Sequence, residues 1–126
     1  MTTVTEETLS VSEVARDSGV APSAVRFYEK HGLITGQRTA GNQRRFHRVE
    51  PCLVKIVRVA QRVGLTVAEI RDLMADLPQD RSEMTLDAFY HLRARLEDEA
   101  RRRLLALTET LDELTSERKL CEIPPK

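Results

Sequence analysis

Apolar residues recur at helical spacing in two short segments near the start of the chain. The first helix is predicted to open with a capping box at Ser10–Glu13, in which the serine hydroxyl and the glutamate side chain each accept from the other's backbone N–H. Its apolar stripe consists of Val11, Val14 and Ala15. Gly19 supplies the positive φ that ends this helix, and Pro22 opens a second one that runs to about His31. The pair predicts a helix-turn-helix, a pattern that many unrelated helical hairpins share.

In the segment from Thr35 to Phe46, turn-forming and basic residues replace the helical spacing of apolar residues. The Gly41–Asn42 pair is a turn former, and arginines surround it, which predicts a small hairpin, or wing, with a cationic tip. Beyond the wing, apolar residues at helical spacing predict a third helix over 49–63 and a fourth over 66–76. Residues 9–76 are therefore expected to form one winged helix-turn-helix domain.

A long helix is predicted over 85–118, after a linker over 77–84 and before a C-terminal tail over 119–126. The helical segment has no glycine or proline and is rich in Ala, Leu, Glu and Arg, so it should extend about 50 Å at 1.5 Å per residue. The apolar positions Leu104, Leu107, Leu111 and Leu114 are spaced as in a coiled-coil seam, and Leu96 and Ala100 extend this stripe less regularly. A lone helix would leave these leucines in water, so we expect a second copy to pair with it. The predicted fold class is mainly α, a winged helix-turn-helix domain followed by a long dimerisation helix.

The charges balance overall but not locally. The chain has 20 basic and 20 acidic residues, yet between residues 21 and 62 nine Lys and Arg stand against only Glu29 and Glu50. Such a cationic segment is typical of a nucleic-acid-binding face, the alternative being a solvated basic surface. No apolar stretch approaches the roughly 20 residues that span a bilayer. Residues 1–8, expected to be a disordered tail, carry no secretory signal, so a cytoplasmic location without a membrane partner is expected.

Candidate chemical sites are few. The sequence has no nucleophile–base pair, carboxylate pair or phosphate-binding glycine loop, so an enzyme is not expected. Cys52 and Cys121 lie far apart and are expected to be reduced, with Cys121 as the candidate thiol switch. The histidines lack metal-ligand spacing, so neither a metal nor a cofactor is expected. A candidate effector pocket, or else only part of the core, lies between linker and long helix at Met74, Phe89 and Tyr90.

The second predicted helix and the wing resemble those of MerR-family regulators. The helix carries Val-Arg-Phe-Tyr-Glu at 25–29, followed by Gly-Leu-Ile at 32–34. The wing, over 38–46, contains Gly-Asn-Gln-Arg-Arg, which is similar to the SoxR-like branch of the family, and Gln-Arg-Val-Gly at 61–64 fits the same branch. The resemblance covers about Leu9 to Asp112, which is most of the chain.

The resemblance implies a mechanism. Such proteins are homodimers whose long helices pair antiparallel, and they bind promoters whose two recognition elements are spaced too far apart for RNA polymerase. The activated dimer bends and undertwists that double-stranded DNA so that the elements align. On this chain Arg26 would contact base edges or phosphate from the major groove, and the Tyr28 hydroxyl and the wing arginines would contact phosphate. The DNA-binding residues expected on these grounds are Ser10, Ser23, Arg26, Phe27, Tyr28, Arg38, Asn42, Arg44 and Arg45.

The same branch carries a 2Fe–2S cluster on four closely spaced cysteines just beyond the long helix. Here residues 111–116 read Leu-Asp-Glu-Leu-Thr-Ser, and two cysteines do not supply four thiolates, so no such cluster is expected. The effector, the operator sequence, the target genes and the choice between activator and repressor stay open. Two alternatives also stay open: an effector-independent, nucleoid-type DNA-binding protein, and a coiled-coil adaptor whose basic segment binds an acidic protein.

Overall fold

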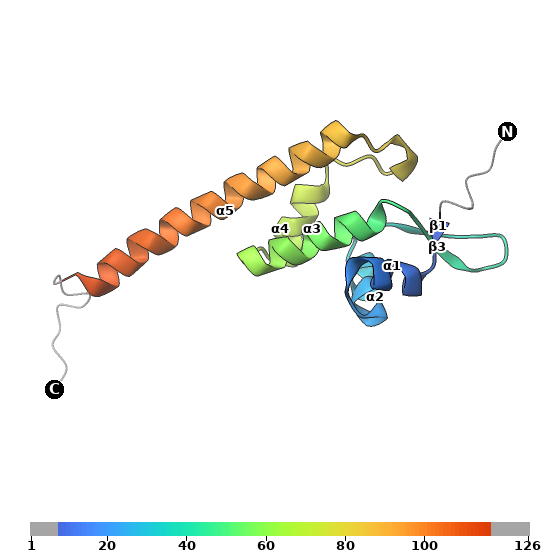
Figure 1. The fold of residues 1–126 in the computed structure, drawn as a ribbon, viewed down its shortest axis with the longest axis horizontal. Coiled ribbons are helices and arrows are strands. Elements are labelled where there is room, and N and C mark those ends of the chain that lie inside the picture. Colours follow the sequence, from blue (N-terminus) through green and yellow to red (C-terminus); the bar gives the residue numbers. More distant parts are fainter. Residues whose placement is uncertain (1–7, 117–126) are drawn as a thin grey trace.

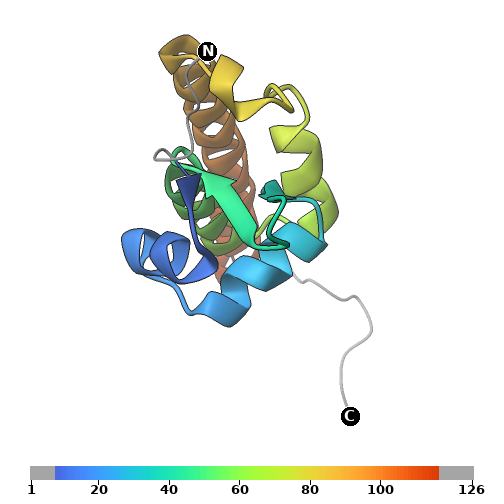
Figure 2. The same cartoon turned by 90° about the vertical axis from the view of Figure 1, so that its right-hand side faces the viewer.

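The computed structural model describes residues 8–116, which form five α-helices and a small three-stranded sheet (Figures 1 and 2). The helices are α1 (Val11–Ser18), α2 (Pro22–Lys30), α3 (Glu50–Val63), α4 (Val67–Met74) and α5 (Leu86–Thr115). The strands are β1 (Thr8–Leu9), β2 (Gly36–Arg38) and β3 (Arg44–His47), and a short 3-10 helix spans Arg81–Glu83. The predicted class, mainly helical with a wing and a long last helix, is confirmed.

The helix boundaries have local causes in the sequence. In the predicted capping box, Ser10 Oγ accepts from the Glu13 N–H at 3.1 Å, and Glu13 Oε1 accepts from the Ser10 N–H at 2.8 Å. Gly19 ends α1 with a φ of 77°, a left-handed conformation that suits glycine. Thr66 begins α4 with a second capping box, and the Thr85 hydroxyl caps α5. These side chains satisfy N–H groups that the helices themselves leave without acceptors.

The sheet has the order β1–β3–β2, and both pairs are antiparallel. The β2–β3 hairpin is the predicted wing. At its base Gly36 lies so close to its neighbours that a Cβ there would stand 2.7 Å from Phe46 Cε2 and 2.8 Å from Glu29 Oε2. Strand β1 corrects the prediction of a disordered tail at Thr8, because this residue pairs with His47 of β3.

The core is formed by α1 to α4, the sheet and the first half of α5. Helix α1 packs against α2, α3 and β3, and Figure 1 shows α3 and α4 beside α5. The side chains buried there include Val14, Val25, Leu33, Phe46, Leu53, Val57 and Ile70. Each such apolar side chain stabilises the fold by about 1.5–3 kcal/mol relative to exposure in water. The core therefore fixes how α2 and the wing are presented to the outside.

The long helix α5 begins at Leu86, one residue after the predicted start, and its two halves pack differently. Its first half contributes Leu92, 2% exposed, and Leu96, 5% exposed, to the core of its own domain. Leu96 is therefore already covered within one chain, and its predicted part in dimerisation stays a prediction. The second half extends beyond the other elements (Figure 1). The helix ends at Thr115, whereas residues 117 and 118 of the prediction lie outside the described residues.

Candidate nucleic-acid interface

Helix α2 has one buried and one exposed face, as the helical period requires. Val25 and Tyr28 are buried against the core, whereas Ser23, Arg26 and Phe27 are exposed on the opposite side. Pro22 occupies the first turn, so the helix starts at a sharp corner after the α1–α2 turn. The structure thus presents three of the predicted DNA-binding residues together on one outward face.

Two cations on this face are free of protein partners. Among residues 8–116, neither Arg26 nor Lys30 makes a hydrogen bond or an ion pair, and both are exposed. By contrast, the one acidic residue of α2, Glu29, is paired with Arg44. An outward helix face that carries unpaired positive charge beside a neutralised carboxylate attracts a polyanion.

The aromatic pair of α2 divides between the surface and the core. Phe27 is 43% exposed, and its ring lies against the His31 ring with centroids 4.3 Å apart. The Tyr28 ring is buried, and its hydroxyl donates to Gln61 Oε1 of α3 at 3.1 Å. The phosphate contact predicted for Tyr28 stays a prediction, and it requires this hydroxyl to leave or share its bond to Gln61.

The wing tip is a tight turn braced by its own side chains. Asn42, rather than Gly41, takes the left-handed conformation, with φ of 63°. Arg38 Nη1 donates to the Asn42 carbonyl and to Asn42 Oδ1, both at 3.3 Å, and the Gln43 N–H donates to Thr39 Oγ1 at 3.2 Å. Because asparagine tolerates this conformation better than most residues, the sequence defines the turn locally. Arg38 and Asn42 are exposed, as a phosphate contact requires.

The two other wing arginines do not lie at the tip, which corrects the sequence prediction. They are consecutive residues of β3, so their side chains point to opposite faces of the sheet. Arg44 forms an ion pair with Glu29 of α2. Arg45 Nε donates to Thr8 Oγ1 at 3.1 Å, and its Nη2 donates to the Thr8 carbonyl at 3.0 Å. Both arginines hold the wing to the rest of the domain, and a DNA contact from either stays a prediction.

Ser10 has a structural task that uses the hydroxyl predicted to meet DNA. It caps α1 through the bonds described above, and the hydrogen bond from its backbone lowers the pKa of Glu13. The serine is half-buried, so only part of its surface faces outward. Its predicted DNA contact is not tested by this geometry.

A buried ion pair that the sequence reasoning missed lies beneath the wing. Glu50, 0% exposed, accepts from Arg81 Nε at 2.9 Å through its Oε2. Arg81 also donates to the Pro78 carbonyl at 2.7 Å and to Thr35 Oγ1 at 3.5 Å. The pair therefore ties the start of α3 to the linker and to the base of the wing. Burial raises the pKa of Glu50, an effect that Arg81 opposes in part.

The three residues of the candidate effector pocket have different surroundings in one chain, and their role stays a prediction. Met74 is buried in the core, and Tyr90 is 52% exposed, with Arg93 over its ring. Phe89 alone borders a hollow of about 270 Å³, whose other lining residues are Val49, Cys52, Leu53, Met84, Thr85 and Leu86. The Cys52 thiol is free and exposed, whereas Cys121 lies outside the described residues.

Other kinds of site have no candidate in the part of the chain that the structure describes. Within residues 8–116, no three His, Cys, Asp or Glu side chains are grouped so as to hold a metal ion. The helices in this range also include none that combines the length and apolar character needed to cross a membrane.

The predicted coiled-coil seam is exposed along the second half of α5. Leu104, Leu107, Leu111 and Leu114 are 57–67% exposed, and Ala100 is half-buried. At 3.6 residues per turn, Leu86 and Phe89 at the start of the helix fall on the same side as these four leucines. One apolar stripe thus runs along both ends of α5, and it is largely exposed to solvent.

Comparison with protein families gives two overlapping matches. The family described as MerR HTH family regulatory protein matches residues 9–77, and the family described as MerR, DNA binding matches residues 53–116. Among curated relatives, the HTH-type transcriptional activator SoxR homolog of Chromobacterium violaceum is 36% identical over 111 residues, which cover 88% of this chain and 74% of that protein. The mercuric resistance operon regulatory protein of Shigella flexneri is 33% identical over 69 residues, 54% of this chain and 48% of that protein.

Solved structures share the architecture. A crystal structure from Listeria monocytogenes, described as a MerR family transcriptional regulator, has a TM-score of 0.56 and 29% identity, with 84% of this chain and 80% of that chain covered. HiNmlR, a MerR family regulator that lacks the sensor domain and was solved bound to promoter DNA, has a TM-score of 0.54 and 19% identity, with 85% and 84% covered. At the second identity the likeness concerns the fold alone.

Proposed function

The chain belongs to the MerR family of helix-turn-helix regulatory proteins, and on that premise we propose that two copies bind a palindromic promoter element and activate transcription by distorting its DNA. It is a DNA-binding transcriptional regulator and not an enzyme. Its partners in the proposal are double-stranded promoter DNA, a second copy of itself, and RNA polymerase at the same promoter. Because promoter DNA is the proposed partner, we place the protein in the cytoplasm.

The observation that carries the DNA contact is the exposed face of α2. Within residues 8–116, Arg26 and Lys30 have no hydrogen-bond or ion-pair partner, and Ser23 lies one turn away at the start of the helix. A helix of this kind fits the major groove, where an arginine distinguishes guanine by a bidentate hydrogen bond. The wing, braced by Arg38 and Asn42, lies beside it and is the proposed contact to the phosphate backbone.

The apolar stripe of α5 supports pairing of two copies. Its leucines from 104 to 114 are exposed, and Leu86, 66% exposed, continues the stripe at the other end of the helix. In an antiparallel pair the second half of one α5 crosses the first half of the other, so the two apolar ends meet. Burial of these side chains between two helices removes from water a surface that no described part of one chain covers.

Distortion of the promoter follows from placing two rigid domains on one duplex. The pair of long helices sets the distance between the two α2 helices, and a duplex whose half-sites do not match that distance must bend or untwist to bind both. Such deformation costs about 1–6 kcal/mol for a site of 20–30 base pairs, which contacts at two half-sites are able to offset.

The proposal is tested by measuring DNA affinity of the wild type and of Arg26→Ala. We expect Arg26→Ala to weaken binding to the preferred operator by about 1–3 kcal/mol, and to weaken binding to unrelated DNA much less. Arg101→Ala is the matched control, since Arg101 is exposed on α5, where it pairs with Glu97 and Asp98. Equal affinity of the wild type for all sequences favours the nucleoid-type alternative. Absence of DNA binding at low salt favours the adaptor.

A further inference from the structure

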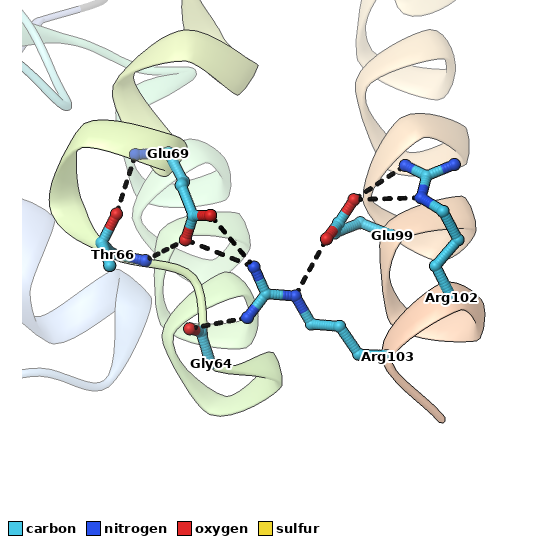
Figure 3. A network of polar contacts seen from close by, with 6 residues as sticks. All are labelled: Gly64, Thr66, Glu69, Glu99, Arg102 and Arg103. Carbon is cyan, nitrogen blue, oxygen red and sulfur yellow. Dashed lines mark hydrogen bonds and ion pairs between the residues drawn. The ribbon is translucent and has the colours of Figure 1, made fainter. Parts of the chain in front are cut away.

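Arg103, on α5, binds two residues of the DNA-binding domain. Arg103 Nη1 donates to the Gly64 carbonyl at 2.8 Å, and its Nη2 donates to the two carboxylate oxygens of Glu69 at 3.2 and 3.3 Å (Figure 3). Its Nε donates to Glu99 Oε2 at 2.9 Å, one turn earlier on α5. Every nitrogen of this guanidinium is therefore committed, and two of the three bond to the domain that carries α2 and the wing.

The two contacts on that domain are at helix ends. Gly64 is the left-handed residue that ends α3, with φ of 108°, so its carbonyl lies at the negative end of the helix dipole. Glu69 is the acid of the α4 capping box and also accepts from the Thr66 N–H at 2.8 Å. Hydrogen bonds from Thr66 and Arg103 hold the pKa of Glu69 below its ordinary value. Arg103 thus binds the α3–α4 turn as a unit.

This contact is the last one before α5 leaves its own domain. Leu92, Leu96, Glu99 and Arg103 follow at steps of four, three and four residues, so they share one face of the helix. The apolar pair packs in the core, and the polar pair continues the same line where the core ends. A second anchor lies earlier, where Arg95 donates to the Leu73 carbonyl at 3.2 Å and to Asp76 Oδ2 at 3.0 Å. Polar contacts at its exit point therefore add to the core packing that holds α5 against its own domain.

We propose that Arg103 is a specificity-determining residue that sets the half-site spacing accepted by the dimer. The inference rests on the proposed pairing of two copies over two half-sites. The exposed leucines from 104 to 114 lie beyond Arg103. A change in the angle between α5 and its own DNA-binding domain at this contact therefore displaces the partner chain and the partner's DNA-binding domain. One base pair of spacing corresponds to about 3.4 Å along the duplex and about a tenth of a helical turn.

The test compares operators that differ only in their central spacer. Half-sites are first selected with the wild-type protein, and affinity is then measured for spacers from two base pairs shorter to two longer than the preferred one, and for a single half-site. We expect Arg103→Met to reduce the preference for the best spacer by about three- to tenfold, the range for losing charge-assisted hydrogen bonds of a partly exposed guanidinium. Binding to the single half-site and dimerisation should stay as in the wild type.

Arg102→Met is the matched control, because Arg102 contacts Glu99 at 2.7 Å but not the DNA-binding domain. It should keep the wild-type preference. Glu69→Gln is the second variant, since glutamine preserves the capping box while it weakens the ion pair, and it should change the preference in the direction of Arg103→Met by a smaller factor. An unchanged preference in Arg103→Met, or an equal loss in Arg102→Met, overturns the inference while the proposed function stands. A wild type that never binds two half-sites together overturns the proposed function itself.

Discussion

The two halves of α5 are similar in sequence but opposite in surroundings. Both are rich in leucine and in charged residues, yet Leu92 and Leu96 are buried within their own chain, whereas Leu104, Leu107 and Leu111 are exposed. The difference arises because the domain formed by α1 to α4 is long enough to cover only the first half. Spacing along a helix therefore identifies an apolar face without identifying what covers it.

The largest effect is expected just before the first half of α5, at the buried ion pair between Arg81 of the 3-10 helix and Glu50 of α3. Replacement of Arg81 with Met leaves the buried Glu50 carboxylate without its partner, and we expect the free energy of unfolding to fall by about 3–5 kcal/mol at neutral pH. Loss of the positive charge raises the pKa of Glu50 further. A carboxyl whose pKa is raised by folding contributes stability below its unfolded value, here 4.5, and loses it as the pH rises through the folded value. The defect should thus grow from acidic to neutral pH in urea unfolding experiments.

The companion variant removes the charge from both sides. Glu50→Gln combined with Arg81→Met should recover much of the lost stability and should lack the added pH dependence. A double variant as unstable as Arg81→Met, with the same pH dependence, would show that the ion pair is not the cause.

The next expected effect compares one leucine from each half. Leu96→Ala should lower the free energy of unfolding by about 2–5 kcal/mol through the cavity it leaves, and the loss should not depend on protein concentration. Leu107→Ala should have little effect on the fold of one chain and should weaken association. Its loss of stability relative to the wild type should therefore depend on protein concentration. Urea unfolding at two protein concentrations a hundredfold apart separates the two outcomes. Identical behaviour of the two variants contradicts the division of α5 into a packed and a paired half.

The helices and the wing were predictable because their signals are local. The capping box at Ser10 and the turn at Gly41–Asn42 each depend on residues within four positions of one another, and each is found as expected. Strand β1 has two residues, which are too few to show an alternating pattern, so the sequence does not distinguish Thr8 from the tail.

The contacts of the candidate site were less predictable because they join distant residues. Glu50 and Arg81 are 31 positions apart, and a glutamate beside a helix-starting proline has an ordinary local explanation at the surface. Arg44 meets Glu29 only after the wing folds back on α2. The sequence therefore located the basic segment correctly but did not reveal which of its arginines are already paired within the protein.

The most direct test of the account is sedimentation equilibrium of the whole chain without DNA, alongside Leu107→Arg, which places a charge in the seam. We expect that at micromolar concentration the wild type has the mass of two chains, and that the variant has the mass of one chain with unchanged helical content. A wild type that remains a single chain at the concentrations at which it binds a two-half-site operator would contradict the account.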